Sequence, residues 1–254
     1  MIDIALFGGA FDPPTIGHHM IMKAVHASTG FDVWMMPCWK HKFDKQLTNP
    51  HLRIPMCEGV TDLLKPWAKV CRFEIKHELS GSMYETILKI KEAYSNHRFH
   101  LIIGSDNINQ IEKWDRGLEL INENPIIVIE RPNYSIDPEK KKLIKDCTLV
   151  NLNWCGSSTA VREAITNHDN KFAARNLDWP VWEYIQNHRL YNFEYTEENF
   201  HQCLKMKQNA TKIILKNLKW NVVDLLGNVL LSNINFCYFC GEKSPQNRGI
   251  QLEL

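Results

Sequence analysis

The chain has 254 residues, enough to bury a full hydrophobic core and to carry an appended segment. Its 30 Lys and Arg residues nearly balance its 29 Asp and Glu residues, and the formal net charge is +1. This balance argues against nucleic-acid binding through a basic surface, so any phosphate binding would have to be local. The sequence contains no run of 18 apolar residues, which argues against a membrane-spanning helix.

The N-terminal residues have a strand pattern from the start, with Ile2, Ile4 and Leu6 in alternation. This pattern leaves no room for the charged and apolar regions of a signal peptide, so we expect a cytoplasmic protein. Most of the 8 cysteines lie singly in apolar segments, as buried thiols do in a reducing compartment. Cys237 and Cys240 have the spacing of half a zinc site, whereas tetrahedral zinc needs four ligands.

Residues 7–18 form the predicted turn between this strand and a helical pattern. Gly8 and Gly9 have no side chains, so the backbone can approach a ligand closely there. The N-terminus of the next helix presents unpaired N–H groups, which favour a negatively charged group such as phosphate. Thr15 and His18 lie three residues apart at this helix start, so a hydroxyl and an imidazole can be directed at one point.

Strand and helix patterns alternate through the next part of the chain. The patterns predict strands at residues 31–37, 70–75, 99–104, 125–130 and 147–152, and helices at 16–28, 50–64 and 87–94, with a helical stretch reaching Trp114. The strand at 31–37 has little polar alternation, which is typical of a parallel sheet covered on both faces.

Two further helix starts have capping residues. Ser82 is a predicted N-cap with Glu85 as its capping-box partner. Ser157 or Ser158 caps a helix that carries Arg162 one turn later. The second start is therefore another predicted phosphate site, here with a guanidinium.

Two motifs resemble those of a known family. Residues 8–18 read Gly-Gly-Ala-Phe-Asp-Pro-Pro-Thr-Ile-Gly-His, and residues 156–162 read Gly-Ser-Ser-Thr-Ala-Val-Arg. The first resembles the (H/T)-x-G-H signature of the nucleotidyltransferase superfamily, in the form found in nicotinate/nicotinamide mononucleotide adenylyltransferases of the bacterial type. The second resembles the I-S-S-T-x-x-R motif of that family, and the order and separation of the two motifs also fit. The resemblance covers residues 1 to about 191.

The resemblance implies an α/β fold with a Rossmann-like, doubly wound parallel sheet and a small C-terminal extension. We expect a nucleotidyltransferase domain over residues 1–193 and an extension of unknown role over residues 194–254. In the extension, Ile213, Ile214 and Leu218 have helical spacing and precede a denser apolar run.

The reaction implied by the resemblance is adenylyl transfer from ATP to nicotinate or nicotinamide mononucleotide in NAD biosynthesis, with Mg²⁺ bridging phosphate oxygens. His18, Thr15 and Arg162 would act at the reacting phosphates. The residues implied in ATP binding are Gly8, Gly9, Phe11, Lys42, Ser158, Thr159 and Arg162. Lys42 lies in a basic, aromatic segment after a predicted strand, where a solvated basic loop is the alternative.

The mononucleotide-binding residues implied by the resemblance are Tyr84, Thr86, Gly104, Asp106, Trp114 and Arg131. Trp114 would stack near the pyridine ring, although a core position is the alternative for a tryptophan. The segment with Tyr84 and Thr86 resembles an S-Y-T motif with one residue inserted, and it could instead be only a helix cap. Arg131 matches an Arg-Pro turn of that family, and the alternative is that its side chain only pairs with a carboxylate.

Two other functions remain open on the sequence alone. One is a related transferase whose acceptor is phosphopantetheine or a riboflavin phosphate. The other is a nucleotide-binding regulator without catalysis, in which the C-terminal extension binds a partner. The expected ligands are ATP and a pyridine mononucleotide, with no nucleic acid and no membrane, and no oligomeric state is predicted.

Overall fold

The structure is a computed structural model that describes residues 1–40, 46–130, 135–152 and 156–194 with their side chains. Beyond residue 194 it describes the backbone of β7 (Lys212–Lys216), β8 (Lys219–Val223), β9 (Val229–Ser232), β10 (Phe236–Cys237) and β11 (Glu242–Lys243). None of the described helices is both long enough and apolar enough to cross a membrane.

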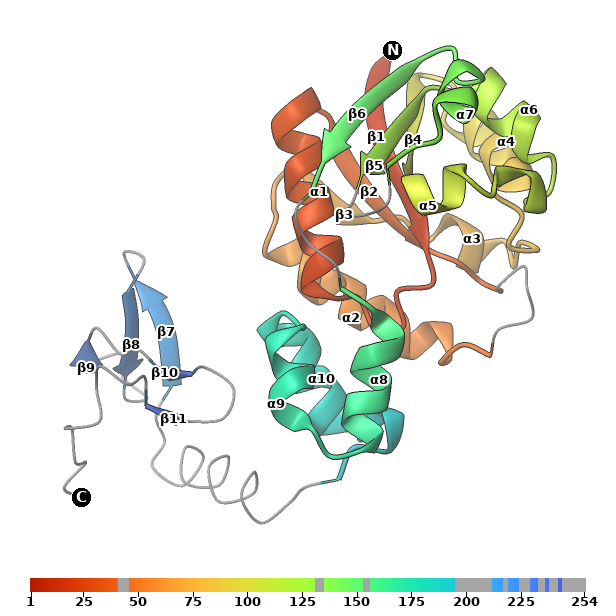
Figure 1. Ribbon diagram of the computed structural model, residues 1–254. Coiled ribbons are helices and arrows are strands. Elements are labelled where there is room, and N and C mark those ends of the chain that lie inside the picture. The colour runs from red at the N-terminus through yellow and green to blue at the C-terminus, as the bar shows by residue number, and fades with distance from the viewer. Residues whose placement is uncertain are drawn as a thin grey trace.

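A six-stranded parallel sheet is the centre of the N-terminal part of the chain (Figure 1). Its strands are β1 (Ile2–Gly9), β2 (Asp32–Pro37), β3 (Ala68–Val70), β4 (His97–Gly104), β5 (Ile126–Glu130) and β6 (Cys147–Asn151). The spatial order β3-β2-β1-β4-β5-β6 confirms the predicted doubly wound α/β fold. β1 and β4 are neighbours, so the order reverses between them, and ligands bind at the carboxyl ends of strands at such a point.

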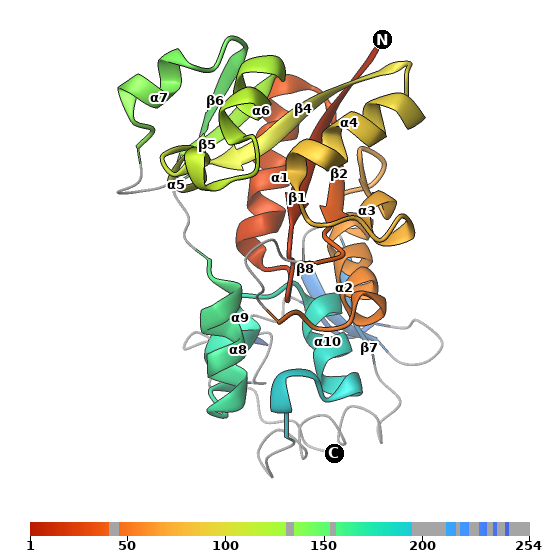
Figure 2. The same ribbon diagram turned by 90° about the vertical axis from the view of Figure 1, so that its right-hand side faces the viewer.

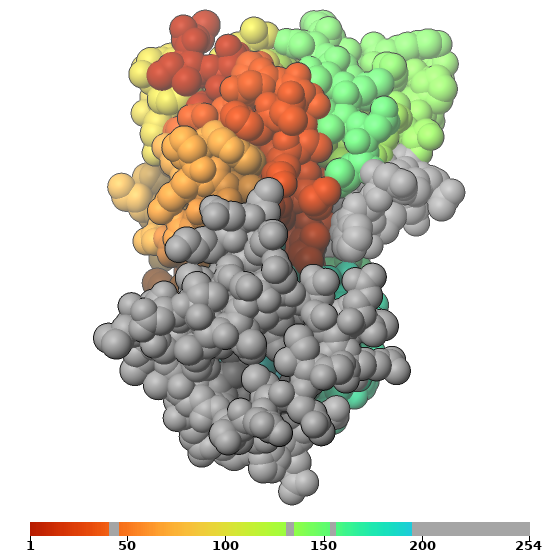
Figure 3. All heavy atoms as spheres, turned by 90° about the vertical axis from the view of Figure 1, so that its left-hand side faces the viewer, coloured from red at the N-terminus to blue at the C-terminus, as the bar shows by residue number. Residues whose placement is uncertain are grey.

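Hydrophobic cores cover both faces of the sheet. On β1, Ala5 and Phe7 belong to one core, whereas Ile4 and Leu6 belong to the other. The helices α1 (Ile16–Thr29) and α2 (Pro50–Asp62) pack on the first face, and α3 (Phe73–Lys76), α4 (Met83–Ala93) and α6 (Gly117–Glu123) on the second. Figure 3 shows the outer surface of α1 between atoms of the α2–β3 region (orange) and of β6 (green).

The remaining helices complete the described domain. They are α5 (Ser105–Ile108), η1 (Ile111–Lys113), α7 (Pro138–Lys142), α8 (Ser158–Thr166), α9 (Asn170–Arg175), α10 (Trp179–His188) and η2 (Leu190–Asn192). Figure 2 shows α8, α9 and α10 grouped beyond the carboxyl end of β1. These helices share the core of α1 and α2, so this group is joined to the sheet by apolar packing.

Two sequence predictions of secondary structure were wrong. The strand predicted at residues 70–75 ends at Val70, and Phe73–Lys76 is the short helix α3. The backbone N–H groups of Lys76 and His77 bond to the carbonyls of Arg72 and Phe73, four residues earlier, as in a helix. In the extension, Ile213 and Ile214 lie in strand β7, which pairs with β8, rather than in a helix. This segment and its partner are rich in β-branched residues, which favour strands.

Candidate active site

The carboxyl end of β1 is packed closely against the start of α4. A Cβ on Gly8 would collide with the terminal methyl group of Met83, so a larger residue at this position would force that flexible side chain to move. A Cβ on Gly9 would lie 3.0 Å from the Phe11 ring, which is itself buried at 2% exposure. Phe11 has φ of 48°, a left-handed value that is uncommon for a residue with a side chain. The Phe11 ring therefore supports the turn from inside, and a ligand would meet the backbone of Gly8 and Gly9.

Thr15 and His18 are in direct contact at the start of α1. The Thr15 backbone N–H donates to Nδ1 of His18 over 2.9 Å, and the Thr15 hydroxyl lies 2.9 Å from the same nitrogen. Because an N–H can only donate, Nδ1 is an acceptor and the neutral ring carries its proton on Nε2. The ring of Phe11 packs edge-on against the imidazole, with centroids 5.1 Å apart. His18 is thus held in one tautomer and one orientation.

The second motif contacts the first across more than 140 residues of sequence. Ser157 is the N-cap of α8 and accepts a hydrogen bond from the backbone N–H of Ala160. The hydroxyl of Ser158 donates to the Pro13 carbonyl over 2.8 Å. Nη1 of Arg162 donates to the Asp12 carbonyl over 2.6 Å, and Nη2 donates to the Thr159 hydroxyl over 3.2 Å. The N-termini of α1 and α8 therefore lie side by side.

A buried arginine braces the loops around these helix starts. Arg53 on α2 has no exposed surface and donates hydrogen bonds to three backbone carbonyls, those of Ala10, Cys38 and Thr48. These carbonyls belong to the β1–α1 turn and to the segments on either side of residues 41–45. Because the guanidinium charge stays positive, it also adds a fixed positive charge beneath a site suited to anions.

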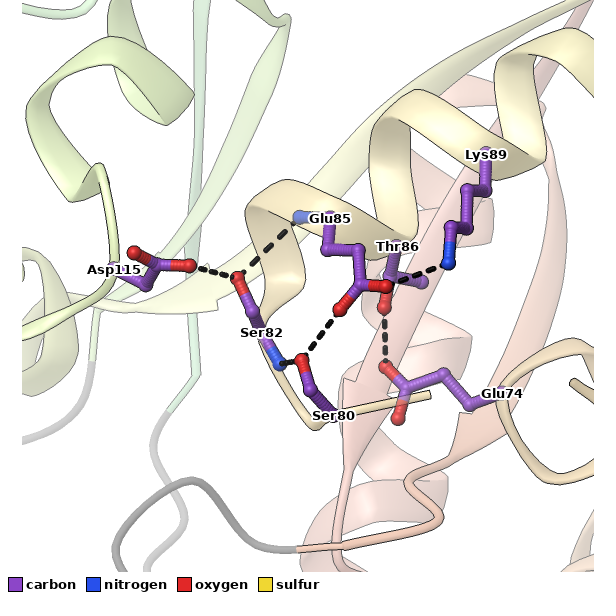
Figure 4. Close-up of polar contacts among 7 residues, drawn as sticks. All are labelled: Glu74, Ser80, Ser82, Glu85, Thr86, Lys89 and Asp115. Carbon is purple, nitrogen blue, oxygen red and sulfur yellow. Dashed lines mark hydrogen bonds and ion pairs between the residues drawn. The ribbon is translucent and has the colours of Figure 1, made fainter. Parts of the chain in front are cut away.

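The N-terminus of α4 is tied to the segment after Trp114 (Figure 4). The Ser82 hydroxyl accepts the Glu85 backbone N–H and donates to the Asp115 carboxylate over 2.6 Å. The predicted N-cap is confirmed, but Glu85 does not complete the capping box. Its carboxylate instead accepts hydrogen bonds from the Ser80 hydroxyl and from Lys89.

The side chains of Tyr84 and Thr86 point into the protein rather than toward the turn after β1. Thr86 has no exposed surface, and its hydroxyl donates to Glu74 over 2.9 Å. Tyr84 is 8% exposed, and the Arg116 guanidinium lies over its ring at 4.0 Å. The expectation that these two side chains hold a ligand is therefore not supported by the geometry, because both are already packed. The backbone N–H groups at the start of α4 remain suited to bind an anion.

At the carboxyl end of β4, Gly104 is overlaid by the Asp106 side chain. A Cβ on Gly104 would collide with Oδ1 of Asp106, and this buried oxygen has no hydrogen-bond partner among the described residues. An unpaired buried carboxylate oxygen is a strong acceptor for a ligand hydroxyl. Trp114 is half-buried and packs against the core on the α4 side of the sheet.

Glu74 is a buried carboxyl group that connects two segments of this region. It accepts hydrogen bonds from the Thr86 hydroxyl and from the Trp39 backbone N–H, 2.9 and 3.3 Å long. Burial raises the pKa of Glu74 from 4.5 to about 7, and these hydrogen bonds oppose the shift only in part. Glu74 consequently changes its protonation state near neutral pH.

We expect Glu74→Gln to change how stability depends on pH. Because the folded-state pKa of Glu74 lies above its unfolded value, the folded protein holds this proton more tightly. Glu74 therefore contributes most to the free energy of unfolding below pH 4.5. This contribution declines by about 3 kcal/mol as the pH rises through 7. The free energy of unfolding of the variant, measured relative to that of the wild type, should therefore be higher at pH 8 than at pH 4 by about this amount.

Denaturant unfolding at both pH values measures this difference, and Glu92→Gln, at an exposed position on α4, is the matched control. Identical pH dependence of the wild type and Glu74→Gln would show that Glu74 does not titrate with a raised pKa.

The described cysteines lack the character of nucleophiles. Cys57 and Cys71 are buried, as predicted, whereas Cys38 and Cys147 are half-buried. Burial raises the pKa of Cys38 to about 11, although Arg53 opposes the change. No group of three metal-ligating side chains occurs within the part of the chain that the structure describes. Lys42, Arg131 and Cys240 lie outside the described residues, and Cys237 is described by its backbone only.

Three functional features were missed by the sequence analysis. Arg53 resembles any solvated residue of an amphipathic helix, because its carbonyl partners lie in other segments. Asp12 was noted only as part of the first motif and residue 191 only as the end of the resemblance, yet Asp12 and Tyr191 form a 2.6 Å hydrogen bond. Glu74 was placed in a strand that does not form, and its burial could not be inferred from the local pattern.

Comparison with known proteins gives consistent matches. A family model described as cytidylyltransferase-like matches residues 6–164. A probable nicotinate-nucleotide adenylyltransferase of Oceanobacillus iheyensis is 32% identical over 196 residues, covering 76% of this chain and 98% of that protein. A second relative of the same name, from Myxococcus xanthus, is 33% identical over 134 residues, covering 52% of this chain and 70% of that protein.

Solved structures match the same region. The nicotinic acid mononucleotide adenylyltransferase of Plasmodium falciparum, complexed with NaAD, superimposes with a TM-score of 0.67 at 27% identity. The same enzyme complexed with APC gives a TM-score of 0.68 at 26% identity. Both alignments cover 76% of this chain and 99% of the other chain.

Proposed function

This chain belongs to the cytidylyltransferase-like family, and from that premise we propose how its residues carry out the reaction of the nicotinate-nucleotide adenylyltransferases that it resembles. The protein transfers the adenylyl group of ATP to nicotinate mononucleotide in NAD biosynthesis. The observation that carries this proposal is the direct contact between the two motifs, in which Ser158 and Arg162 bond to the carbonyls of Pro13 and Asp12.

The reaction is a direct displacement at phosphorus. A phosphate oxygen of the mononucleotide attacks the α-phosphorus of ATP, the bond from that phosphorus to the β-phosphate oxygen breaks, and pyrophosphate leaves. The protein has little covalent work in such a step, so it accelerates the reaction by aligning two anions and stabilising charge on the leaving group. Two neighbouring helix N-termini provide a favourable electrostatic environment for this chemistry.

We assign His18 and Thr15 to the reacting phosphates. The ring proton of His18 is on Nε2, so the imidazole can donate a hydrogen bond to a phosphate oxygen on the side away from Thr15. Arg162, Ser158 and Thr159 are assigned to the β- and γ-phosphates, and the backbone at Gly8 and Gly9 to the nucleotide. Lys42 remains a predicted contact to the triphosphate.

The mononucleotide is assigned to the edge formed by β4 and the start of α4. The α4 backbone N–H groups near Met83 and Tyr84 favour a carboxylate, since they donate and the helix dipole is positive there. Oδ1 of Asp106, which has no hydrogen-bond partner among the described residues, suits a ribose hydroxyl, and the half-buried Trp114 suits stacking on the pyridine ring. Gly104 leaves room for the Asp106 side chain, and Arg131 remains a predicted contact.

Mg²⁺ fits this site as an ion carried by the triphosphate. Mg²⁺ commonly takes most of its ligands from phosphate oxygens and water, so a preformed cluster of protein ligands is not needed. The chemistry that Mg²⁺ supplies when bound is neutralisation of charge on the leaving pyrophosphate.

We propose residues 1–193 as the catalytic domain and residues 194–254 as an extension. Phe193 still belongs to the core, with its ring perpendicular to that of Trp182 at 5.4 Å, so the boundary cannot lie earlier. The alignment with the Oceanobacillus relative uses 98% of that protein but 76% of this chain, which supports a catalytic domain shorter than the whole chain. A chain ending at Phe193 that was insoluble or inactive would contradict this boundary.

The proposed function is tested by measuring pyrophosphate release with ATP, Mg²⁺ and one acceptor at a time. We expect release with nicotinate mononucleotide and none with phosphopantetheine or riboflavin phosphate. Release with one of the last two acceptors but not with a pyridine mononucleotide would assign the chain to a related transferase. No release with any acceptor, despite ATP binding, would indicate a nucleotide-binding regulator.

A further inference from the structure

Asp12 connects four segments that meet at the active site. Its Oδ1 accepts a 2.6 Å hydrogen bond from the Tyr191 hydroxyl, and its Oδ2 accepts the Thr48 backbone N–H over 2.9 Å. Its carbonyl accepts Nη1 of Arg162 over 2.6 Å. Because Asp12 is only 3% exposed, these contacts fix its position from both the backbone and the side chain.

Tyr191 reaches Asp12 from an unusual backbone conformation. Its φ and ψ are 58° and 36°, and Arg189 and Asn192 also have positive φ values of 50° and 59°. Residues with side chains adopt this region rarely, and they keep it where the surrounding structure determines it. The Thr166 hydroxyl donates to the Tyr191 carbonyl over 3.3 Å, so α8 holds this turn as well. The same helix carries Arg162 one turn earlier.

We propose that Tyr191 is a positioning residue for ATP: through Asp12, its hydroxyl fixes the carbonyl on which Arg162 is anchored. This inference rests on the proposed function, which assigns Arg162 to the β- and γ-phosphates. Tyr191 does not touch the substrate in this account. It determines where the guanidinium is held.

The chemistry of the contact supports this role. Burial and the neighbouring Asp12 raise the pKa of Tyr191, so its hydroxyl stays protonated and donates at neutral pH. A hydrogen bond to a buried carboxylate is stronger than one between neutral groups. Phenylalanine at this position would keep the ring and remove the hydroxyl, so the Asp12 carboxylate would lose one of its two hydrogen bonds to described residues. The hydrogen bond between the Tyr191 hydroxyl and the Thr48 side chain would be lost with it.

The test is equilibrium binding of ATP with Mg²⁺, measured by calorimetry on the full chain. We expect Tyr191→Phe to raise the Kd for ATP about threefold to tenfold and to leave the Kd for nicotinate mononucleotide within about twofold. Tyr184→Phe is the matched control, because the Tyr184 ring stacks on His188 away from this network, and it should change neither Kd. Equal weakening of both ligands by Tyr191→Phe, or no weakening of ATP, would overturn the proposal.

A double-mutant cycle separates positioning from general destabilisation. If Tyr191 acts through Arg162, Tyr191→Phe should have little further effect on ATP binding in the Arg162→Ala background, whereas additive losses would contradict the proposal. If Tyr191→Phe does not fold, Asp12→Asn weakens the same hydrogen bond while keeping an oxygen acceptor, and unchanged ATP binding would then overturn it. These binding measurements do not require the protein to convert an acceptor into product, so they can be interpreted even if the proposed reaction is wrong.

Discussion

Replacement of His18 by alanine is expected to lower turnover about 10²–10³-fold without unfolding the protein, the usual effect of losing one preorganised donor in the transition state. Thr15 holds Nδ1 of His18 as an acceptor, so the ring is prepared to donate from Nε2. Alanine removes that donor, while the backbone of the turn at Gly8 and Gly9 stays as it is. The loss should appear in kcat, because the interaction strengthens as charge develops on the reacting phosphates.

Two variants sharpen this experiment. His18→Gln can present a side-chain N–H and should recover part of the lost turnover. His188→Ala, at an exposed position on α10, removes an imidazole far along the chain from the motif and should retain normal turnover. Near-normal turnover of folded His18→Ala would make His18 a structural residue and remove it from the mechanism.

Replacement of Arg162 by alanine is expected to raise the KM for ATP by roughly 10–100-fold, which corresponds to losing charged hydrogen bonds worth about 1.5–3 kcal/mol. The guanidinium is anchored on Asp12 and Thr159 and is half-buried at the start of α8. Because it is assigned to the β- and γ-phosphates alone, the KM for the mononucleotide should change little.

Steady-state kinetics with each substrate varied in turn measure this split. Arg175→Ala, at an exposed position on α9, is the matched control for loss of a positive charge and should leave both KM values unchanged. Arg162→Lys keeps the positive charge but loses the paired N–H donors of the planar guanidinium, so its KM for ATP should lie between those of the wild type and Arg162→Ala. An effect confined to the KM of the mononucleotide would refute the assignment.

The sequence predicted those parts of the fold that depend on local patterns. Five predicted strands lie within a few residues of β1, β2, β4, β5 and β6, because continuous apolar runs between turn residues mark buried strands well. The caps at Ser82 and Ser157 were also found, since an N-cap is a local signal. The strand at residues 70–75 failed because α3 is decided by burial of Phe73 and Glu74 against other elements.

The site was predictable only where its residues belong to a compact motif. Thr15 and His18 could be placed together because they are one helical turn apart. The contacts of Asp12 with Tyr191 and of Arg53 with Ala10 join residues separated by 179 and 43 positions, and no local pattern indicates such pairs. For Tyr84 and Thr86, a resemblance in sequence does not show whether a side chain faces a ligand or the core, and the structure packs both side chains into the protein.

The most direct test of the account is to compare kcat/KM for nicotinate and nicotinamide mononucleotide under identical conditions, with dinucleotide and pyrophosphate both quantified. Backbone N–H groups at the start of α4 bind a carboxylate well, whereas an amide also needs an acceptor for its NH₂ group. We therefore expect equal amounts of dinucleotide and pyrophosphate, and a higher kcat/KM for the nicotinate form. A tenfold or greater preference for the amide, about 1.4 kcal/mol in transition-state binding, or no dinucleotide from either acceptor, would contradict it.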